Sequence, residues 1–314
     1  MNIGIIGAGM STVGFTANLK GSHNISIFEK AKRVGGRLTM HSRVHRNEII
    51  KFNLGAQYAK ASSSEFKQLL KDAGCKTISG TILDNISQSI IKSSDKYIHQ
   101  NGLHNVVEYH LQSQNIKLNT LVTNVNLDQK TLSFDGAPDE EFDLIISSTP
   151  LPQFNALANI NNRSSEELFS KCIAVGVLLN DDALFKHNCY KNISNLLSWT
   201  SLSTAFCSRS PTSITIHFTQ NVSNELFDLE DLDIASIAID DIVKSLGINK
   251  SSFTNNIKVF KWRYALCKKD FTKEGYMKIS NDVFAIGDWA LGPRVESAYD
   301  SGKKLANLIN AWVL

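Results

Sequence analysis

Apolar and polar positions in the first thirty residues follow the pattern of a βαβ unit. Ile3, Ile5 and Ile6 form a short apolar run that predicts a strand, and a helical pattern then continues to about Leu19. The segment from Ile25 to Glu29 returns to an extended pattern. The glycine-containing stretch between them is therefore predicted to be a turn that leads from a strand into a helix.

That turn resembles a dinucleotide-binding fingerprint in which one position differs. Gly7 and Gly9 match the first two glycines of G-x-G-x-x-G, whereas Thr12 stands at the third. Glu29 follows Gly9 by twenty residues, where an acidic side chain reaches a ribose hydroxyl in such folds. An ordinary glycine turn is the alternative, but the strand, the helix and the acid in register favour a dinucleotide site. Gly14 is a candidate source of relief for the bulk of Thr12, and the Ser11 or Thr12 hydroxyl is a candidate pyrophosphate contact.

The remainder of the chain predicts further helices and strands around a second, mixed α+β region. The helical patterns cover 62–74, 102–112 and 229–246, the last stopped by Gly247. The extended patterns cover 116–125, 131–134, 142–148, 172–179 and 213–219. No repeat or long linker separates the parts, so we expect the chain to cross between two domains several times.

Composition and charge narrow the class of protein. The 314 residues are 42% hydrophobic, and the 33 basic and 30 acidic residues give a net charge of +3 without a concentrated patch. We therefore expect neither a nucleic acid nor a membrane as partner. No apolar run of about 18 residues is present, and because the first predicted strand begins at Asn2 we expect no cleavable signal segment. The five cysteines form no C-x-x-C pair and favour reduced thiols in the cytoplasm, with no metal site: Cys75, Cys172, Cys189, Cys207 and Cys267.

Two further segments indicate that the dinucleotide is FAD rather than NAD. After the second strand, Gly35 and Gly36 let backbone N–H groups approach a phosphate, and Arg37 adds positive charge. Near the other end, an apolar strand over 283–286 leads into Gly287 and Asp288. Asp288 is placed to accept hydrogen bonds from sugar-like hydroxyls.

A predicted helix follows this second turn and begins near Val295. Its apolar face is expected to carry Ala298, Gly302, Leu305, Ile309 and Trp312. The positive N-terminal end of this helix would favour the negative charge of a reduced flavin. Segment 287–302 contains no cysteine or histidine, which favours non-covalent binding of the FAD.

Four stretches resemble the renalase-like flavoproteins, a branch of the FAD-dependent amine oxidase superfamily. They are VGGRLT at 34–39, NLGAQY at 53–58, WRYA at 262–265 and GDWALGPRVESAYDSG at 287–302. The resemblance implies an α/β fold with a Rossmann-like FAD-binding domain and an interleaved mixed α+β substrate domain. We assign 1–60, 101–150 and 268–314 to the FAD-binding domain, and 61–100 and 151–267 to the substrate domain.

The same resemblance implies a cofactor site and the part that each segment plays in it. The two turns and Glu29 would hold the ADP part, Val122 would lie beside the adenine, and the last segment would lie along the ribityl chain and flavin. The expected cofactor-binding residues are Gly7, Gly9, Met10, Ser11, Thr12, Glu29, Lys30, Gly36, Arg37, Leu38, Val122, Gly287, Asp288, Arg294, Val295 and Glu296.

The activity implied by the resemblance is oxidation of isomeric dihydronicotinamide dinucleotides, 2- or 6-dihydro-NAD(P), to NAD(P)⁺. A hydride would pass to flavin N5, and molecular oxygen would be reduced to hydrogen peroxide. Such a substrate is a hydride donor and needs no strong general base. The candidate catalytic and pocket residues are Tyr58, Trp199, His217, Arg263, Tyr264 and Trp289, each of which could instead be an ordinary core residue.

The substrate motifs depart from the family more than the cofactor motifs do. Asn53 stands where many relatives carry Asp, and Val222 where relatives commonly show Trp. Three alternatives therefore stay open: a flavin amine oxidase acting on a small amine, an FAD-binding redox sensor or interaction protein without turnover, and a nicotinamide-dependent dehydrogenase that uses only the first βαβ unit.

Overall fold

The structure is a computed structural model of the 314-residue chain. It describes residues 1–162, 164–180, 185–205, 211–268 and 270–312, with the backbone alone at 93–95 and 164. The α-helices are α1 Met10–Asn18, α2 Ser64–Asp72, α3 His104–Leu111, α4 Leu151–Leu157, α5 Ser164–Glu167, α6 Gln220–Glu225, α7 Asp231–Leu246 and α8 Val295–Asn310. The 3₁₀ turns are η1 Gly36–Leu38, η2 Ser203–Ala205, η3 Lys250–Ser252 and η4 Asp288–Ala290.

The strands form four sheets, two of which are large. The strands are β1 Asn2–Ile6, β2 Asn24–Phe28, β3 His41–His45, β4 Glu48–Phe52, β5 Lys76–Asp84, β6 Ser89–Ile98, β7 Asn115–Lys117, β8 Val122–Asn126, β9 Thr131–Phe134, β10 Ala137–Glu141, β11 Leu144–Ser147, β12 Phe169–Leu179, β13 Cys189–Lys191, β14 Leu197–Leu202, β15 Ser213–Phe218, β16 Phe253–Cys267, β17 Met277–Lys278 and β18 Val283–Ala285.

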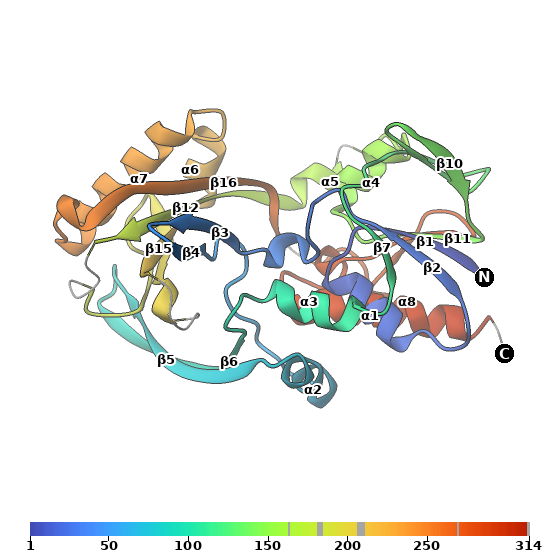
Figure 1. Cartoon of the computed structure of the whole chain (residues 1–314), viewed down its shortest axis with the longest axis horizontal. Helices are drawn as coiled ribbons and strands as arrows, with labels where there is room; N and C mark the ends of the chain where they lie inside the picture. Colours follow the sequence, from blue (N-terminus) through green and yellow to red (C-terminus); the bar gives the residue numbers. More distant parts are fainter. Residues whose placement is uncertain (163, 181–184, 206–210, 269, 313–314) are drawn as a thin grey trace.

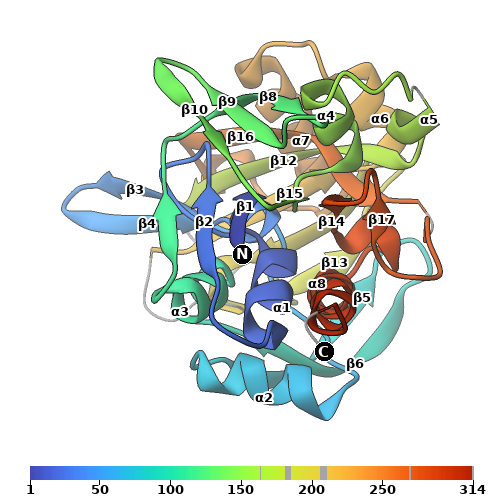
Figure 2. The ribbon, with the colours of Figure 1, turned by 90° about the vertical axis from the view of Figure 1, so that its right-hand side faces the viewer.

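A six-stranded sheet with the order β17-β18-β11-β1-β2-β7 forms one half of the fold. All of its strands are parallel except the edge strand β17. Alternation along β1 sends Ile3 and Ile5 into one core and Ile6 into another. Helices α1, α3 and α8 cover the first face, and β8, β9 and β10 cover the second (Figure 2). A parallel sheet covered on both faces is the arrangement that crossover connections produce.

A seven-stranded, mainly antiparallel sheet forms the other half, in the order β16-β12-β15-β14-β13-β5-β6. One of its faces is covered by α7, whose buried residues Ile234, Ala238 and Ile242 share a core with Ile214 and Ile216 of β15. The other face meets the β4 hairpin and the segment that follows it. Figure 1 shows the two halves side by side, with the long strands β12 and β16 running between them.

The structure confirms the predicted fold class and most of the predicted elements, with two corrections. The stretch 116–125 is not one strand, because β7 joins the parallel sheet and β8 begins a separate three-stranded sheet. Helix α8 ends at Asn310, so Trp312 lies beyond it, 46% exposed, with its ring 5.8 Å from that of Phe284.

The division into domains stays a prediction, and the structure adds one observation to it. The apolar face of α2 packs in the same core as α1 and α3, although segment 61–100 was assigned to the substrate domain. Strands β5 and β6 from the same segment join the seven-stranded sheet. Cys75, Cys172, Cys189 and Cys267 are free thiols, and Cys207 lies outside the described residues.

Candidate functional site

In the glycine turn before α1, Gly7 N donates to Phe28 O at 2.8 Å and Ala8 N to Glu29 Oε2 at 3.0 Å, whereas no described residue accepts from the N–H groups of Gly9, Met10 and Ser11. Gly7 has a φ of +96°, which favours glycine, and Gly9 precedes the helix with no side-chain cap. The first α1 hydrogen bond is donated by Val13 N to Gly9 O at 3.2 Å. A Cβ atom built on Gly9 would meet no atom within 4 Å, so the space above this helix start is open. Open N–H groups at a helix start suit a phosphate.

Thr12 stabilises the turn instead of disturbing it. Its side chain is fully buried, and its hydroxyl donates to Gly7 O at 2.8 Å. The hypothesis that the Thr12 hydroxyl contacts a pyrophosphate is therefore wrong, because its hydrogen is already used within the turn. The corresponding hypothesis for Ser11 stays a prediction.

Close packing of α1 depends on two glycines that lie outside the fingerprint. A Cβ on Gly14 would lie 2.0 Å from Tyr299 O in α8, and a Cβ on Gly302 would lie 1.9 Å from Ser11 O. The two helices therefore touch backbone to backbone (Figure 2). This contact brings the N-terminal ends of α1 and α8 into the same region.

Glu29 is a buried carboxylate that the first turn holds in place. Its Oε2 accepts from Ala8 N at 3.0 Å, and its Oε1 accepts from Ala31 N at 2.9 Å. Each oxygen keeps acceptor capacity for a further donor such as a ribose hydroxyl. The neighbouring Lys30 is exposed.

Arg37 and Asp288 form an ion pair, which corrects the interpretation of both residues. Arg37 Nη2 lies 2.5 Å from Asp288 Oδ1, and Nη1 lies 3.1 Å from Oδ2. Nη1 also donates to Ala265 O at 2.9 Å. Arg37 therefore does not offer an unpaired charge to a diphosphate, whereas Asp288 is paired with Arg37 and still keeps acceptor capacity on each oxygen for a further donor. Gly36, next to Arg37, has a φ of +53° and no atom within 4 Å of a built Cβ.

The N-terminus of α8 is open in the same way as that of α1. Gly292 has a φ of +113° with open space at a built Cβ, and the exposed Arg294 precedes the helix without a side-chain cap. Ala298 N makes the first backbone hydrogen bond of this helix, to Arg294 O at 3.2 Å. Within the described residues, the N–H groups of Val295 and Ser297 have no partner.

Glu296 faces the segment before α2 rather than the open end of α8. Its carboxylate accepts from Ser62 N at 2.7 Å, Ser63 N at 2.8 Å and Ser63 Oγ at 2.9 Å. Burial alone would raise the pKa of Glu296, but these hydrogen bonds hold the pKa below its usual value. A flavin contact by its side chain is therefore an incorrect expectation, and Glu296 positions α8 against α2.

These features fit FAD at the cofactor residues. Three open glycines, two uncapped helix starts and one buried carboxylate belong to the turns that follow β1, β2 and β18 of the same parallel sheet. The side chains of Met10, Leu38 and Val122 are buried in the cores, so only their backbone could face a nucleotide. Gly287 lies against Trp289, whose Nε1 would be 2.4 Å from a Cβ built there.

Three of the six candidate pocket residues lie together on one face of the seven-stranded sheet. Trp199 and His217 are paired across β14 and β15, and the Tyr58 ring lies 6.3 Å from that of Trp199. Gln57, which the sequence did not single out, joins them: its Oε1 accepts from Trp199 Nε1 at 3.1 Å and from Ser201 Oγ at 2.8 Å. Its position next to Tyr58 in the stretch NLGAQY was the sequence signal that could have identified Gln57.

His217 is a neutral imidazole in this cluster. Among the described residues its buried Nε2 has no hydrogen-bond partner, and burial lowers its pKa to about 4. Burial likewise raises the pKa of the Cys172 thiol on β12 to about 12. Neither group is charged near neutral pH.

The other three candidates make their contacts outside this cluster, so the structure does not bring the six residues together. Alternation along β16 turns Arg263 to the opposite face, where its guanidinium lies 5.4 Å from the Phe227 ring. Tyr264 packs edge-on against Phe169, with ring centres 5.6 Å apart. Trp289 is fully buried against Phe271 in the core beneath η4.

Lys96 on β6 completes the cluster and was missed by sequence analysis. Its ammonium lies 4.4 Å from the centre of the Tyr58 ring and 5.9 Å from that of Trp199, and the residue is only 4% exposed. Burial lowers its pKa. The surrounding stretch IIKSSDKY is polar, so a surface strand was the natural interpretation.

The segment that follows β4 connects this cluster to the cofactor residues. Ala56 N donates to Arg37 O at 2.9 Å, and Gly55 lies so close that a Cβ would be 2.2 Å from that oxygen. Gln57 and Tyr58 follow directly. The aromatic cluster is therefore tied to the Arg37–Asp288 pair through a short, tightly held segment.

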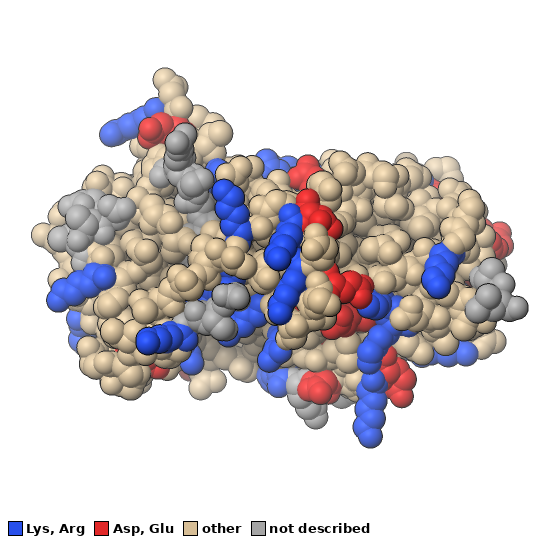
Figure 3. Space-filling model, turned by 90° about the horizontal axis from the view of Figure 1, so that it is seen from below, with Lys and Arg blue, Asp and Glu red and all other residues tan. Residues whose placement is uncertain are grey.

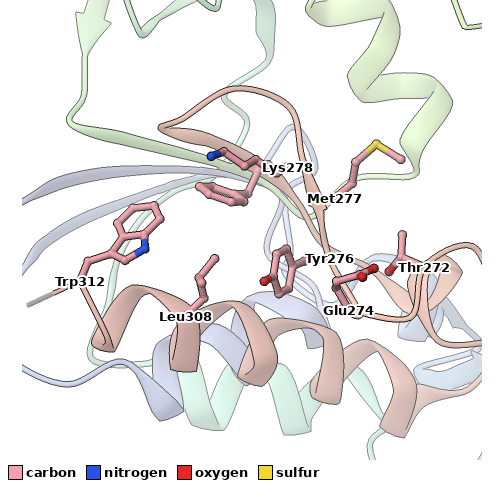
Figure 4. Close-up of a pocket in the computed structure, with 8 residues that line it drawn as sticks. Thr272, Glu274, Tyr276, Met277, Lys278, Leu308 and Trp312 are labelled. Carbon is pink, nitrogen blue, oxygen red and sulfur yellow. The ribbon is translucent and has the colours of Figure 1, made fainter.

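Two surface features lie away from this site. An open groove of about 490 Å³ lies between β17 and the C-terminal half of α8. The side chains of Leu308 on α8 and of Trp312 just beyond it point toward Lys278 (Figure 4). It lies along the edge of the parallel sheet, and none of the candidate site residues lines it.

On the face seen in Figure 3, Lys and Arg are interspersed with Asp and Glu. None of the helices in the described ranges is long and apolar enough to span a membrane.

Comparisons with known proteins support the fold. Residues 5–73 match the family model described as an NAD(P)-binding Rossmann-like domain. No curated protein sequence matches. Among solved structures, a putrescine oxidase bound to putrescine aligns with a TM-score of 0.73 and 12% identity over 99% of each chain.

Two further structures align as extensively. A candidate protoporphyrinogen oxidase from Exiguobacterium sp. 255-15 has a TM-score of 0.77 and 10% identity over 99% of each chain. A fatty acid isomerase from P. acnes that produces CLA has a TM-score of 0.70 and 12% identity over 98% of each chain. The chain therefore has a mixed α/β fold with a Rossmann-like nucleotide-binding domain, as in these structures.

Proposed function

We propose that the chain is an FAD-dependent oxidoreductase that oxidises 2- or 6-dihydro-NAD(P) to NAD(P)⁺ with molecular oxygen as electron acceptor. The observation that carries this proposal is the Tyr58–Trp199 pair, fixed by Gln57 and tied to the cofactor residues through Ala56. Two rings of this kind suit a flat heterocycle such as a dihydronicotinamide. FAD, bound non-covalently, would accept the hydride and pass the electrons to oxygen.

The residues of the chain orient the substrate and exclude water rather than move a proton. His217 is neutral, and the thiol of Cys172 is protonated at neutral pH. A substrate that already is a hydride donor needs no general base, which agrees with this cluster. Gln57 Oε1 accepts hydrogen bonds from both Trp199 Nε1 and Ser201 Oγ. The Trp199 ring is therefore held in position before the substrate binds.

A flavin amine oxidase is the second candidate, favoured by the putrescine-bound structural neighbour. Against it stands Lys96, whose ammonium already lies over the Tyr58 ring. A protonated amine would meet like charge there. The named neighbours also include a candidate protoporphyrinogen oxidase and an isomerase, so the fold admits several substrates.

Anaerobic mixing tests the proposal. Purified yellow protein is mixed with dihydro-NAD(P) isomers or with putrescine while flavin absorbance is followed. Bleaching within seconds by an isomer, and not by putrescine, is the expected result. Bleaching by putrescine alone would favour the amine oxidase. If neither compound bleaches the flavin, the remaining alternative is an FAD-binding redox sensor or interaction protein without turnover. A colourless protein that binds NAD would overturn FAD binding.

We also propose the cytoplasm as the location, because four cysteines are unpaired thiols. The supporting test is fractionation of the cells that make the protein, with a disulfide-specific label as a second readout. Recovery in an oxidising compartment would contradict this location.

A further inference from the structure

The Lys96 ammonium is buried without a negatively charged partner among the described residues. It lies over the faces of two rings, 4.4 Å from the centre of Tyr58 and 5.9 Å from that of Trp199. The other charged or titratable groups that act on it are Lys60, which repels it, and the Cys189 thiol, whose pKa burial raises to about 11. A buried cation with no counter-ion is costly. Ring faces offset only part of that cost.

Backbone contacts hold Lys96 at this position. The next residue, Tyr97, forms a bridge with Ala59: Tyr97 N donates to Ala59 O at 2.8 Å, and Ala59 N donates to Tyr97 O at 2.9 Å. Lys96 and Tyr58 therefore precede two residues that are directly paired. The ammonium faces the aromatic cluster for reasons of backbone geometry, not because an acid attracts it.

We propose that Lys96, Tyr58 and Trp199 form a subsite for one anionic group, a carboxylate or a phosphate, on a planar substrate. The rings supply stacking area, and Lys96 supplies the missing counter-charge, so substrate binding would complete the ion pair. The subsite makes Lys96 a specificity-determining residue that excludes protonated amines. This inference rests on the proposed function for the identity of the site as a substrate site.

Two matched ligand pairs test the subsite on the FAD-loaded protein by isothermal titration calorimetry. Nicotinate and nicotinamide share one ring and differ by a carboxylate. Nicotinamide mononucleotide and nicotinamide riboside differ by a phosphate. We expect at least one anionic member to bind ten-fold or more tightly than its neutral counterpart, and the pair concerned identifies carboxylate or phosphate as the group. Equal affinities within both pairs, or no binding of either anion, would overturn the proposal.

Variants separate recognition from structural support. Lys96→Met should remove the preference for the anion, Lys96→Arg should retain it, and Lys92→Met, on the exposed part of the same strand, should leave it unchanged. If Lys96→Met does not fold, Lys96→Gln and the wild-type preference still decide the question. A Lys96→Met protein that keeps the full preference shows that Lys96 is only structural.

The two proposals fail independently. A protein that prefers the anion but is not bleached by any dihydronicotinamide keeps the subsite and loses the proposed reaction. A protein that is bleached but shows no charge preference keeps the reaction and loses the role of Lys96.

Discussion

Arg37 and Asp288 are 251 positions apart, and their side chains are joined by two hydrogen bonds of 2.5 and 3.1 Å. The first residue follows the second strand of the parallel sheet, and the second follows its strand β18. The pair also meets Ala265 O at the end of β16, from the other sheet. The ion pair therefore connects the turn after β2, the turn after β18 and the end of β16, beside the candidate cofactor residues.

Removing either charge of this pair should destabilise the protein more than removing both. Asp288 is 10% exposed and Arg37 30% exposed, so each would leave a poorly solvated charge behind. We expect Arg37→Met and Asp288→Asn each to lower the free energy of unfolding by about 3 kcal/mol. The double variant should lose less than either single variant, as measured by urea unfolding. Additive losses would show that the two side chains do not interact.

Substitution by alanine should affect different properties at two glycines of the first βαβ unit. It should lower stability at Gly14 and FAD affinity at Gly9. Gly14→Ala places a Cβ 2.0 Å from Tyr299 O, and separating α1 from α8 should cost about 2 kcal/mol after the gain in helix propensity. Gly9→Ala meets nothing within the chain, so stability should change by less than about 0.5 kcal/mol. FAD affinity should fall in Gly9→Ala, because the methyl group would occupy the open space above the helix start.

Thermal unfolding and flavin fluorescence measure these two effects. Gly80→Ala is the matched control, because its built Cβ also meets nothing within 4 Å and β5 lies far from the turn. Loss of stability in Gly9→Ala, or tight FAD binding by it, would contradict the assignment of the open space to the cofactor.

The local parts of this fold could be predicted from the sequence, whereas contacts between distant segments could not. The turn at Gly7 and the end of α7 at Gly247 each depend on neighbouring residues, and both are found in the structure. The ion pair of Arg37 depends on a residue 251 positions away. Arg263 and Lys96 show the same limit, because the face that a residue occupies depends on sheet register and on what covers that face.

Thr12 should contribute to stability through its hydroxyl and not to cofactor binding. Thr12→Val keeps the shape but loses the hydrogen bond to Gly7 O, which also accepts from Ser148 Oγ at 2.8 Å. Because that oxygen stays paired, we expect a loss of about 1 kcal/mol with unchanged FAD affinity. Thr12→Gly should lose about 2 kcal/mol, since glycine also weakens the helix. A ten-fold weaker FAD affinity in Thr12→Val would support the hypothesis that the Thr12 hydroxyl contacts the pyrophosphate.

Substrate turnover should depend on Gln57 and not on Arg263. Gln57→Leu removes the acceptor of both Trp199 Nε1 and Ser201 Oγ, so the Trp199 ring would lose its fixed position. We expect kcat/KM to fall about ten-fold or more, measured by stopped-flow flavin bleaching. Arg263→Ala, on the opposite face of β16, should keep wild-type kcat/KM. The reverse result would move the substrate site to the Phe227 side of the sheet.

His217 should make the protein less stable as the pH falls. Its pKa is about 4 in the folded protein and about 6.5 in the unfolded chain, so unfolding takes up a proton between these values. At pH 7.5 both states are neutral and the group has no effect. From pH 6.5 down to 4 the free energy of unfolding should decrease by up to about 3 kcal/mol on its account. His217→Gln should lack this component, so its advantage over wild type in urea unfolding should grow toward pH 4.5. Parallel pH curves for the two proteins would show that folding does not lower the pKa of His217.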